Sequence, residues 1–262
     1  MIGCKDKTSD TPQPEIAVAN SYIGAALRDL CGYQQQVFDL VPPGMCPGHF
    51  DISPSQVNTL CNCKILFVFD FQKNIEKAIP RIRERGLKVC KITPSPGMCI
   101  PETYLSIVKQ TADVLSQQYP LKENKFVSRV NEIEKRLQNL SQHITDRVKK
   151  SGLLDTKVIT SQHQAEFVKW LGLDCVSPFA GRDTITPAQI DQNLREAKQN
   201  QIQFIIANKQ EGTEMAETIA EYLKVKYVVF SNFPGIDRPN ASIPEYDHLV
   251  VENVNRLIEA IE

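Results

Sequence analysis

One segment constrains the fold of this chain more than any other, the run from residue 124 to residue 150. It contains no glycine or proline, the two residues that most often end a helix. Its apolar residues recur at spacings of three and four, as on one face of an α-helix. They are Phe126, Val130, Ile133, Leu137, Leu140, Ile144 and Val148. At about 1.5 Å per residue, we predict a single helix about 40 Å long.

The segments on either side of this run both alternate between strand-like and helix-like patterns. Before it, the apolar run over residues 64–71 is typical of a strand buried on both faces, and Ser53-Pro54 is typical of a helix start. After it, residues 157–161 and 203–207 are strand-like and alternate with helical segments. We therefore predict an α/β fold, with two Rossmann-like β/α lobes joined by a single long backbone helix and a ligand cleft between the lobes.

The predicted organisation has four parts. Residues 1–15 form a polar tether, 16–123 the N-terminal β/α lobe, 124–152 the backbone helix and 153–262 the C-terminal β/α lobe. The longest apolar runs are strand-sized, well short of the roughly 20 residues that cross a bilayer.

Composition and motifs exclude several classes of function. The 30 basic and 31 acidic residues are well mixed along the chain, which argues against a nucleic-acid partner. The sequence has no glycine-rich phosphate loop, no GxSxG and no HExxH, so we do not expect an enzyme. We expect a monomeric binding protein.

The N-terminus carries a second feature, the string Met1-Ile2-Gly3-Cys4. An apolar residue and a glycine before a cysteine resemble the end of a bacterial lipobox. In that motif Cys4 would carry lipid, and the polar residues after it would act as a flexible tether. We therefore expect an extracytoplasmic protein, in the periplasm or at the cell surface, that meets the membrane only through this anchor. The alternative is an ordinary cysteine beside a disordered tail.

Three strings resemble the zinc/manganese-type (cluster A-I) periplasmic solute-binding proteins of metal ABC transporters. They are "NSYIGAALRDLCG", "GHFDISPSQVNTLCNCKILFVFD" and "ITPAQIDQNLREAKQNQIQFIIANKQEGTEMAETIAEYLKVK". The resemblance covers roughly residues 16–262. It implies capture of a transition-metal ion in the inter-lobe cleft, outside the cytoplasmic membrane, and delivery to an ABC-transporter permease.

The resemblance is weakest at the metal ligands, which the family usually supplies from four positions. His49 falls on the first, and the second falls in residues 95–101, which contain no histidine. The third falls near His163, after a shift of one or two residues. The fourth falls at Ser231-Asn232, where the family's carboxylate is missing.

The chain instead repeats the string PGMC, at residues 43–46 and 96–99. Thiolate and thioether sulfur favour soft or borderline ions such as copper(I) or zinc. We therefore predict a metal site built from Cys46, His49, Cys99 and His163. Further ligand-contacting residues are predicted to be Met45, Met98, Asn208, Ser231 and Asn232. Zinc is the ion implied by the resemblance, whereas copper(I) follows from the sulfur chemistry.

Three alternatives remain open for this site. A disulfide between Cys46 and Cys99 would remove both thiolates from metal binding. The sulfur atoms could instead line a pocket for a metal chelate or organic ligand of the siderophore or corrinoid kind, with Tyr33, Phe50, Phe179 and Phe233 in its wall. A structural lipoprotein of the adhesin type would bind no small ligand tightly.

Overall fold

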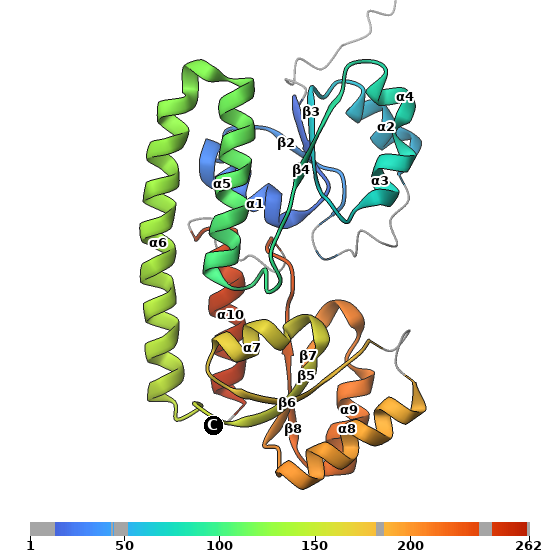
Figure 1. Ribbon diagram of the computed structural model, residues 1–262, viewed down its shortest axis with the longest axis vertical. Coiled ribbons are helices and arrows are strands. Elements are labelled where there is room, and N and C mark those ends of the chain that lie inside the picture. The colour runs from blue at the N-terminus through green and yellow to red at the C-terminus, as the bar shows by residue number, and fades with distance from the viewer. Residues whose placement is uncertain (1–13, 43, 45–51, 182–185, 236–242, 261–262) are drawn as a thin grey trace, which may run out of the picture.

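The computed structural model describes residues 14–42, 44, 52–181, 186–235 and 243–260. These residues form two β/α lobes, each built on a four-stranded sheet, beside one long helix (Figure 1). The N-terminal lobe contains β1 (Ile16–Val18), α1 (Ser21–Cys31), β2 (Val37–Asp39), α2 (Pro54–Leu60), β3 (Ile65–Phe69), α3 (Lys73–Ala78), α4 (Pro80–Arg83), β4 (Lys88–Ile92) and α5 (Pro101–Gln118). The 3₁₀ turn η2 (Pro120–Lys122) leads into the long helix α6 (Glu123–Lys150).

The C-terminal lobe repeats the alternation. Its elements are β5 (Lys157–Ser161), η3 (Gln162–Gln164), α7 (Ala165–Trp170), β6 (Asp174–Phe179), α8 (Pro187–Asn200), β7 (Phe204–Asn208), η4 (Lys209–Glu211), α9 (Glu214–Leu223), β8 (Lys226–Phe230) and α10 (Glu245–Glu259). The predicted fold of two β/α lobes and one backbone helix is confirmed.

The two sheets have the same topology. Their strand orders are β2-β1-β3-β4 and β6-β5-β7-β8, and all neighbouring strands are parallel. In each sheet the strand order reverses between the two central strands, β1 and β3 or β5 and β7. Ligands of such sheets bind at that reversal, outside the carboxyl ends of the strands. In Figure 1 those ends face the junction between the lobes, so the junction is where a ligand site is expected.

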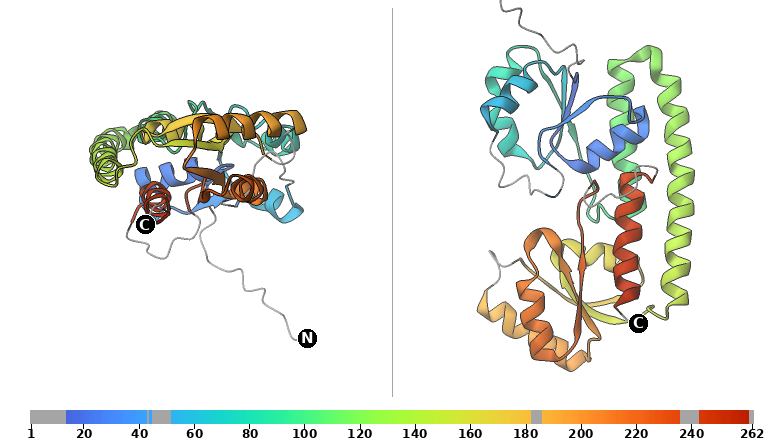
Figure 2. Two further views of the ribbon diagram at one scale, coloured as in Figure 1. Left: turned by 90° about the horizontal axis from the view of Figure 1, so that it is seen from below. Right: turned by 180° about the vertical axis from the view of Figure 1, so that it is seen from behind.

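Helix α6 forms as its periodicity predicts and runs beside both lobes (Figures 1 and 2). Six of the seven predicted stripe residues are buried, and Val130 is partly buried against the same core. The buried six are Phe126, Ile133, Leu137, Leu140, Ile144 and Val148. One hydrophobic core includes this stripe together with residues of both sheets, such as Phe67 and Phe230. Because the lobes share this core, they are not independent hydrophobic units.

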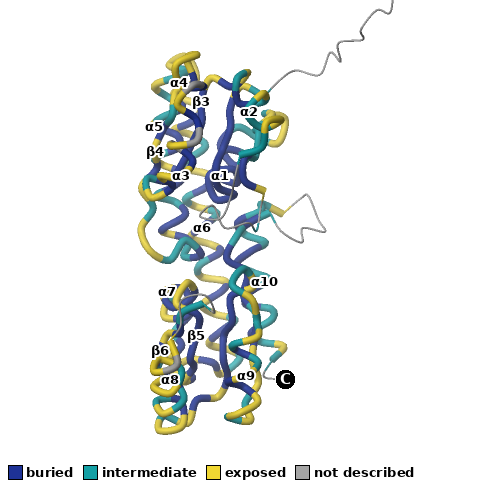
Figure 3. Tube along the Cα trace, turned by 90° about the vertical axis from the view of Figure 1, so that its right-hand side faces the viewer, coloured by how far each residue is buried: buried dark blue, intermediate teal, exposed yellow. Residues whose placement is uncertain are grey.

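The burial pattern is layered, with buried strands inside and exposed helix faces outside (Figure 3). All five residues of β3 are buried, as its continuous apolar run predicts, and so are all five of β7. Within the described ranges, no helix combines the length and apolarity needed to cross a bilayer.

Local signals mark some of the helix starts, and one expected helix is corrected. At the predicted start of α2, the Ser53 hydroxyl oxygen accepts from the Gln56 N–H, and the Ser53 backbone N–H donates to Gln56 Oε1 at 2.9 Å. After the apolar run of residues 64–71, the sequence pattern predicts one helix to about Arg85. This prediction is wrong, because the segment divides into α3 and α4 at Pro80. Proline lacks the N–H that continues a helix and here begins a new one.

Candidate functional site

The carboxyl ends of the two central C-terminal strands bring a histidine and a glutamate together. His163 lies in η3, directly after β5, and Glu211 lies in η4, directly after β7. Because β5 and β7 are neighbours, His163 Nδ1 comes within 2.9 Å of Glu211 Oε1. Asn208 Nδ2 donates to Glu211 Oε2 at 3.1 Å, and the Ser161 hydroxyl donates to the same oxygen.

The electrostatics of this cluster favour a charged carboxylate beside an accessible imidazole. Burial alone would raise the pKa of Glu211, but hydrogen bonds from His163 and Ser161 outweigh it and hold that pKa below its usual value. The hydrogen bond to Glu211 raises the pKa of His163. The His163 side chain is 60% exposed, whereas that of Glu211 is 22% exposed. Imidazole nitrogen and carboxylate oxygen are both common ligands of zinc.

On the N-terminal side, Cys99 is buried at the contact between the lobes. Its Sγ lies 3.1 Å from the Tyr22 hydroxyl and donates to Asn232 Oδ1, in the C-terminal lobe, at 3.6 Å. Burial raises the pKa of Cys99 to about 12, even though the hydrogen bond with Tyr22 lowers it. Cys99 is therefore a neutral thiol in the metal-free protein, and a metal would have to displace its proton.

The segment after β8, where the family carries its fourth ligand, is held by neutral amides. The Ser231 N–H donates to Asn253 Oδ1, and the Asn232 N–H donates to Gln210 Oε1, both at 2.8 Å. Ser231 and Asn232 are each only 8% exposed. This position therefore offers neutral oxygen atoms where the family pattern has a carboxylate.

The second PGMC string packs directly against the C-terminal lobe. Gly97 has a φ of +77°, a conformation that L side chains rarely adopt. A Cβ at this position would lie 2.6 Å from Ile100 Cδ1 and 3.0 Å from Glu166 Cβ. Glu166 lies in α7, three residues after His163, and Met98 is partly buried against the shared core. The loop that carries Cys99 thus reaches the first turn of α7.

Three buried tyrosines complete the lobe junction, and sequence reasoning missed them. Tyr22, Tyr104 and Tyr246 lie on α1, α5 and α10, and each is fully buried. The rings of Tyr104 and Tyr246 stack at a centroid distance of 3.8 Å, and the Tyr246 hydroxyl donates to the Cys99 carbonyl at 2.8 Å. Phe233, which the organic-ligand alternative places in a pocket wall, packs against Tyr22. These rings form an internal contact between the lobes.

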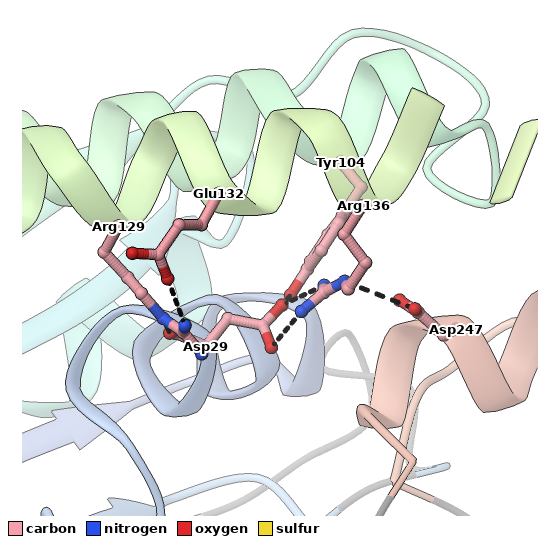
Figure 4. Close-up of polar contacts among 6 residues, drawn as sticks. All are labelled: Asp29, Tyr104, Arg129, Glu132, Arg136 and Asp247. Atoms are coloured by element: carbon pink, nitrogen blue, oxygen red, sulfur yellow. Dashed lines mark hydrogen bonds and ion pairs between the residues drawn. The ribbon is translucent and has the colours of Figure 1, made fainter. Parts of the chain in front are cut away.

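A buried ion-pair network ties α1, α6 and α10 together (Figure 4). Arg136 of α6 donates to both carboxylate oxygens of Asp29, at 3.0 and 2.6 Å, and pairs with Asp247 of α10 at 3.2 Å. The Tyr104 hydroxyl also donates to Asp29, at 2.8 Å. Burial, followed by the nearby Asp29 charge, raises the pKa of Asp247 to about 6 against the opposing effect of Arg136.

A second set of ion pairs joins α1 to α10 and to the end of β2. Arg28 of α1 lies 3.0 Å from Glu245 of α10 and 3.3 Å from Asp39 at the end of β2. The sequence gives no local signal of the contacts between helices, because Arg28 and Glu245 are 217 residues apart and Asp29 and Arg136 are 107 residues apart. Together the two networks oppose relative movement of the lobes.

Most of the predicted site residues fall into three groups. Cys46, His49 and Met45 lie outside the described residues, as does Cys4. Cys99 and Asn232 are in contact across the lobe junction. His163 and Asn208 both contact Glu211. Within the described part of the chain, no three histidine, cysteine, aspartate or glutamate side chains gather closely enough to hold a metal ion.

The cysteines bear on the disulfide alternative. The described cysteines with free thiols are Cys31, Cys61, Cys63, Cys90, Cys99 and Cys175. Cys46, the partner proposed for Cys99 in that alternative, lies outside the described residues.

Comparisons with known proteins agree with the two-lobed fold. The model of the ZnuA family, "Zinc-uptake complex component A periplasmic", matches residues 100–260. A manganese-bound periplasmic metal-binding protein from Candidatus Liberibacter asiaticus is similar in structure, with a TM-score of 0.78 and 13% identity over 94% of this chain and 99% of that one. The cadmium-bound form of that protein gives the same values. A crystal structure of ZnuA has a TM-score of 0.75 and 17% identity over 94% and 98% of the two chains. No curated protein matches the sequence.

Proposed function

This chain belongs to the ZnuA family of periplasmic zinc-uptake components, and on that premise we propose that it captures a transition-metal ion outside the cytoplasmic membrane and delivers it to an ABC-transporter permease. The family is one of transport components and not of enzymes. The proposed cargo is zinc, as in the family description, or manganese, which is bound in a structural neighbour. Copper(I) is a further candidate because of the sulfur chemistry of the two PGMC strings.

One observation carries this proposal beyond family membership, the imidazole and carboxylate paired where the C-terminal sheet reverses its strand order. His163 and Glu211 follow the two central strands at their carboxyl ends, where ligands of such sheets bind. The accessible ring of His163 is suited to first contact with an ion that arrives from solvent.

The proposed ligand set is Cys46, His49, Cys99 and His163. Met45, Met98, Asn208, Ser231 and Asn232 are proposed as its surroundings. The chemistry of the described members supports a borderline ion, since they combine an imidazole with a thiol. The thiol of Cys99 would lose its proton when the ion binds, because thiolate is the coordinating form.

Closure of the lobes around the ion is proposed to be small. The shared core and the ion pairs of Arg136 and Arg28 join α1, α6 and α10, so a large hinge motion would have to break buried charge contacts. Binding would then be adjusted by the loops at the strand ends, while the lobes keep their relative position.

The proposed setting is a monomer anchored by lipid on Cys4, with residues 5–15 as a tether. This anchor would keep the protein near its permease without a membrane-spanning helix. Mass spectrometry of the protein extracted from its native membrane tests this directly. The expected result is a lipid-modified Cys4, and an unmodified residue there would refute the anchor.

Calorimetric titration of the metal-free protein with Zn²⁺, Mn²⁺ and, under anaerobic conditions, Cu⁺ tests the ligand set. We expect Cys46→Ser, Cys99→Ser and His163→Ala to lose tight binding while remaining folded. His143→Ala and Cys175→Ser are matched controls, because His143 is exposed on α6 and Cys175 is a free thiol in β6. Wild-type affinity in the first three variants would remove those residues from the site.

A further inference from the structure

We infer that Glu211 is a positioning residue for the captured ion: it fixes the ring and tautomer of His163 so that Nε2 is the nitrogen that binds metal. The inference rests on the proposed function and names one device within the same site. Sequence reasoning placed neither Glu211 nor this role, because the turn after β7 gives no local sign that it faces β5.

The contact between the two side chains determines which ring nitrogen is free. A carboxylate can only accept hydrogen bonds, and a neutral imidazole has one donor nitrogen and one acceptor nitrogen. Because His163 Nδ1 lies 2.9 Å from Glu211 Oε1, the ring proton is on Nδ1 and the lone pair is on Nε2. Metal-binding histidines commonly give their other ring N–H to a carboxylate, which orients the ring and raises its basicity.

Glu211 is itself held in place from both central strands. Ser161, at the end of β5, and Asn208, at the end of β7, donate to Oε2, the oxygen that does not face His163. Ser161 is fully buried and Asn208 is only 3% exposed, so both donors are fixed by their surroundings. The carboxylate therefore points one oxygen into the sheet end and presents the other to the imidazole.

The N-terminal sheet provides an internal comparison for this arrangement. Gln72 is the third residue after β3, as Glu211 is the third residue after β7, and β3 and β7 hold the same place in the two strand orders. The Gln72 amide donates to the Ala19 carbonyl at 2.9 Å and accepts from the Phe69 N–H at 2.8 Å. Gln72 is buried and neutral, and both ends of its amide are used by backbone.

Gln72 and Glu211 hold the same place in the two sheets but differ in charge. A neutral amide suffices to close the strand ends of one sheet, whereas the other sheet has an ionised carboxylate and a largely exposed imidazole at the same place. An ionised group costs more to desolvate than a neutral amide. The ionised carboxylate of Glu211 is therefore explained better by an ion to be bound than by closure of the sheet.

Nitrogen-15 NMR of the imidazole rings in the full-length, metal-free protein is the first test. The chain has four histidines, so the signal of His163 is assigned by comparison with His163→Ala. We expect wild-type His163 to carry its proton on Nδ1, and to keep that proton when Zn²⁺ binds at Nε2. A neutral His163 ring with its proton on Nε2 in the metal-free protein, or loss of the Nδ1 proton to Zn²⁺, would overturn the inference without any variant at Glu211.

Glu211→Gln is the matched variant, since it gives this position the side chain found at Gln72. Asn208 Nδ2 keeps an oxygen at the Oε2 position, so the new NH₂ group faces His163 and favours the other tautomer. We expect the Nδ1–H signal to be lost and the affinity for Zn²⁺ to fall about 10- to 100-fold. Glu214→Gln, in the first turn of α9, is the control, and it should change neither the Nδ1–H signal of His163 nor the affinity for Zn²⁺.

The outcomes distinguish this inference from the proposed function. If His163→Ala abolishes Zn²⁺ binding while Glu211→Gln binds as wild type, the positioning role is wrong and the metal site stands. If His163→Ala itself binds Zn²⁺ as wild type, the proposed ligand set is wrong and the inference falls with it.

Discussion

Arg136 is the residue whose removal tests most sharply how the two lobes are held together. Arg136→Met keeps much of the apolar stem and removes the guanidinium that contacts both Asp29 and Asp247. The Asp29 side chain is 6% exposed and that of Asp247 is 13% exposed, so both carboxylates would lose a charged partner at a place largely shielded from water. Removal of one partner from a buried ion pair costs about 3–5 kcal/mol.

We expect the lower end of that range, about 3 kcal/mol, because Arg136 is 25% exposed and Asp29 keeps the Tyr104 hydroxyl. In a chain of this size that loss lowers the midpoint of thermal unfolding by roughly 6–12 °C. Urea unfolding followed by circular dichroism measures the free energy. Lys135→Met, an exposed neighbour on α6, is the matched control. A free energy of unfolding for Arg136→Met within about 0.5 kcal/mol of wild type would refute the argument.

Three further predictions concern the lobe junction. Because burial raises the pKa of Asp247 to about 6, the folded protein binds this proton more tightly than the unfolded chain, so the free energy of unfolding should fall as pH rises from about 4 to about 6. Asp247→Asn should flatten that slope in urea titrations at several pH values, and an unchanged slope would assign it to other groups. Gly97→Ala should destabilise the protein by about 1–3 kcal/mol, more than Gly86→Ala, which has a positive φ but no neighbour within 4 Å of its added Cβ. Cys99 should resist alkylation at mildly alkaline pH in the metal-free native protein and react in denaturant, and rapid native labelling would contradict its burial as a neutral thiol.

Much of the fold could be predicted from the sequence, because its signals are local. The apolar stripe of α6 and the buried run of β3 follow from periodicity, and each is a property of neighbouring residues. The break at Pro80 is also a local signal, because proline lacks the N–H that would continue the helix of α3 into α4.

The candidate site could be predicted only in part, because its chemistry depends on strand order. His163 was identified from the resemblance, but its partner Glu211 is 48 residues away and is brought near only because β5 and β7 are adjacent. Cys99 was identified from the repeated string, whereas its burial against Tyr22 and Asn232 depends on how the lobes meet. The pairing of Asp29 with Arg136, across 107 residues, likewise left no local trace.

The central claim, capture of a transition-metal ion in the inter-lobe cleft, is tested most directly by elemental analysis of the protein purified anaerobically, with free thiols counted before and after the metal is removed. The account predicts about one equivalent of a transition metal per chain, with Cys46 and Cys99 protected until the metal is stripped. A chain that carries no metal and takes up none from Zn²⁺, Mn²⁺ or Cu⁺ would contradict it.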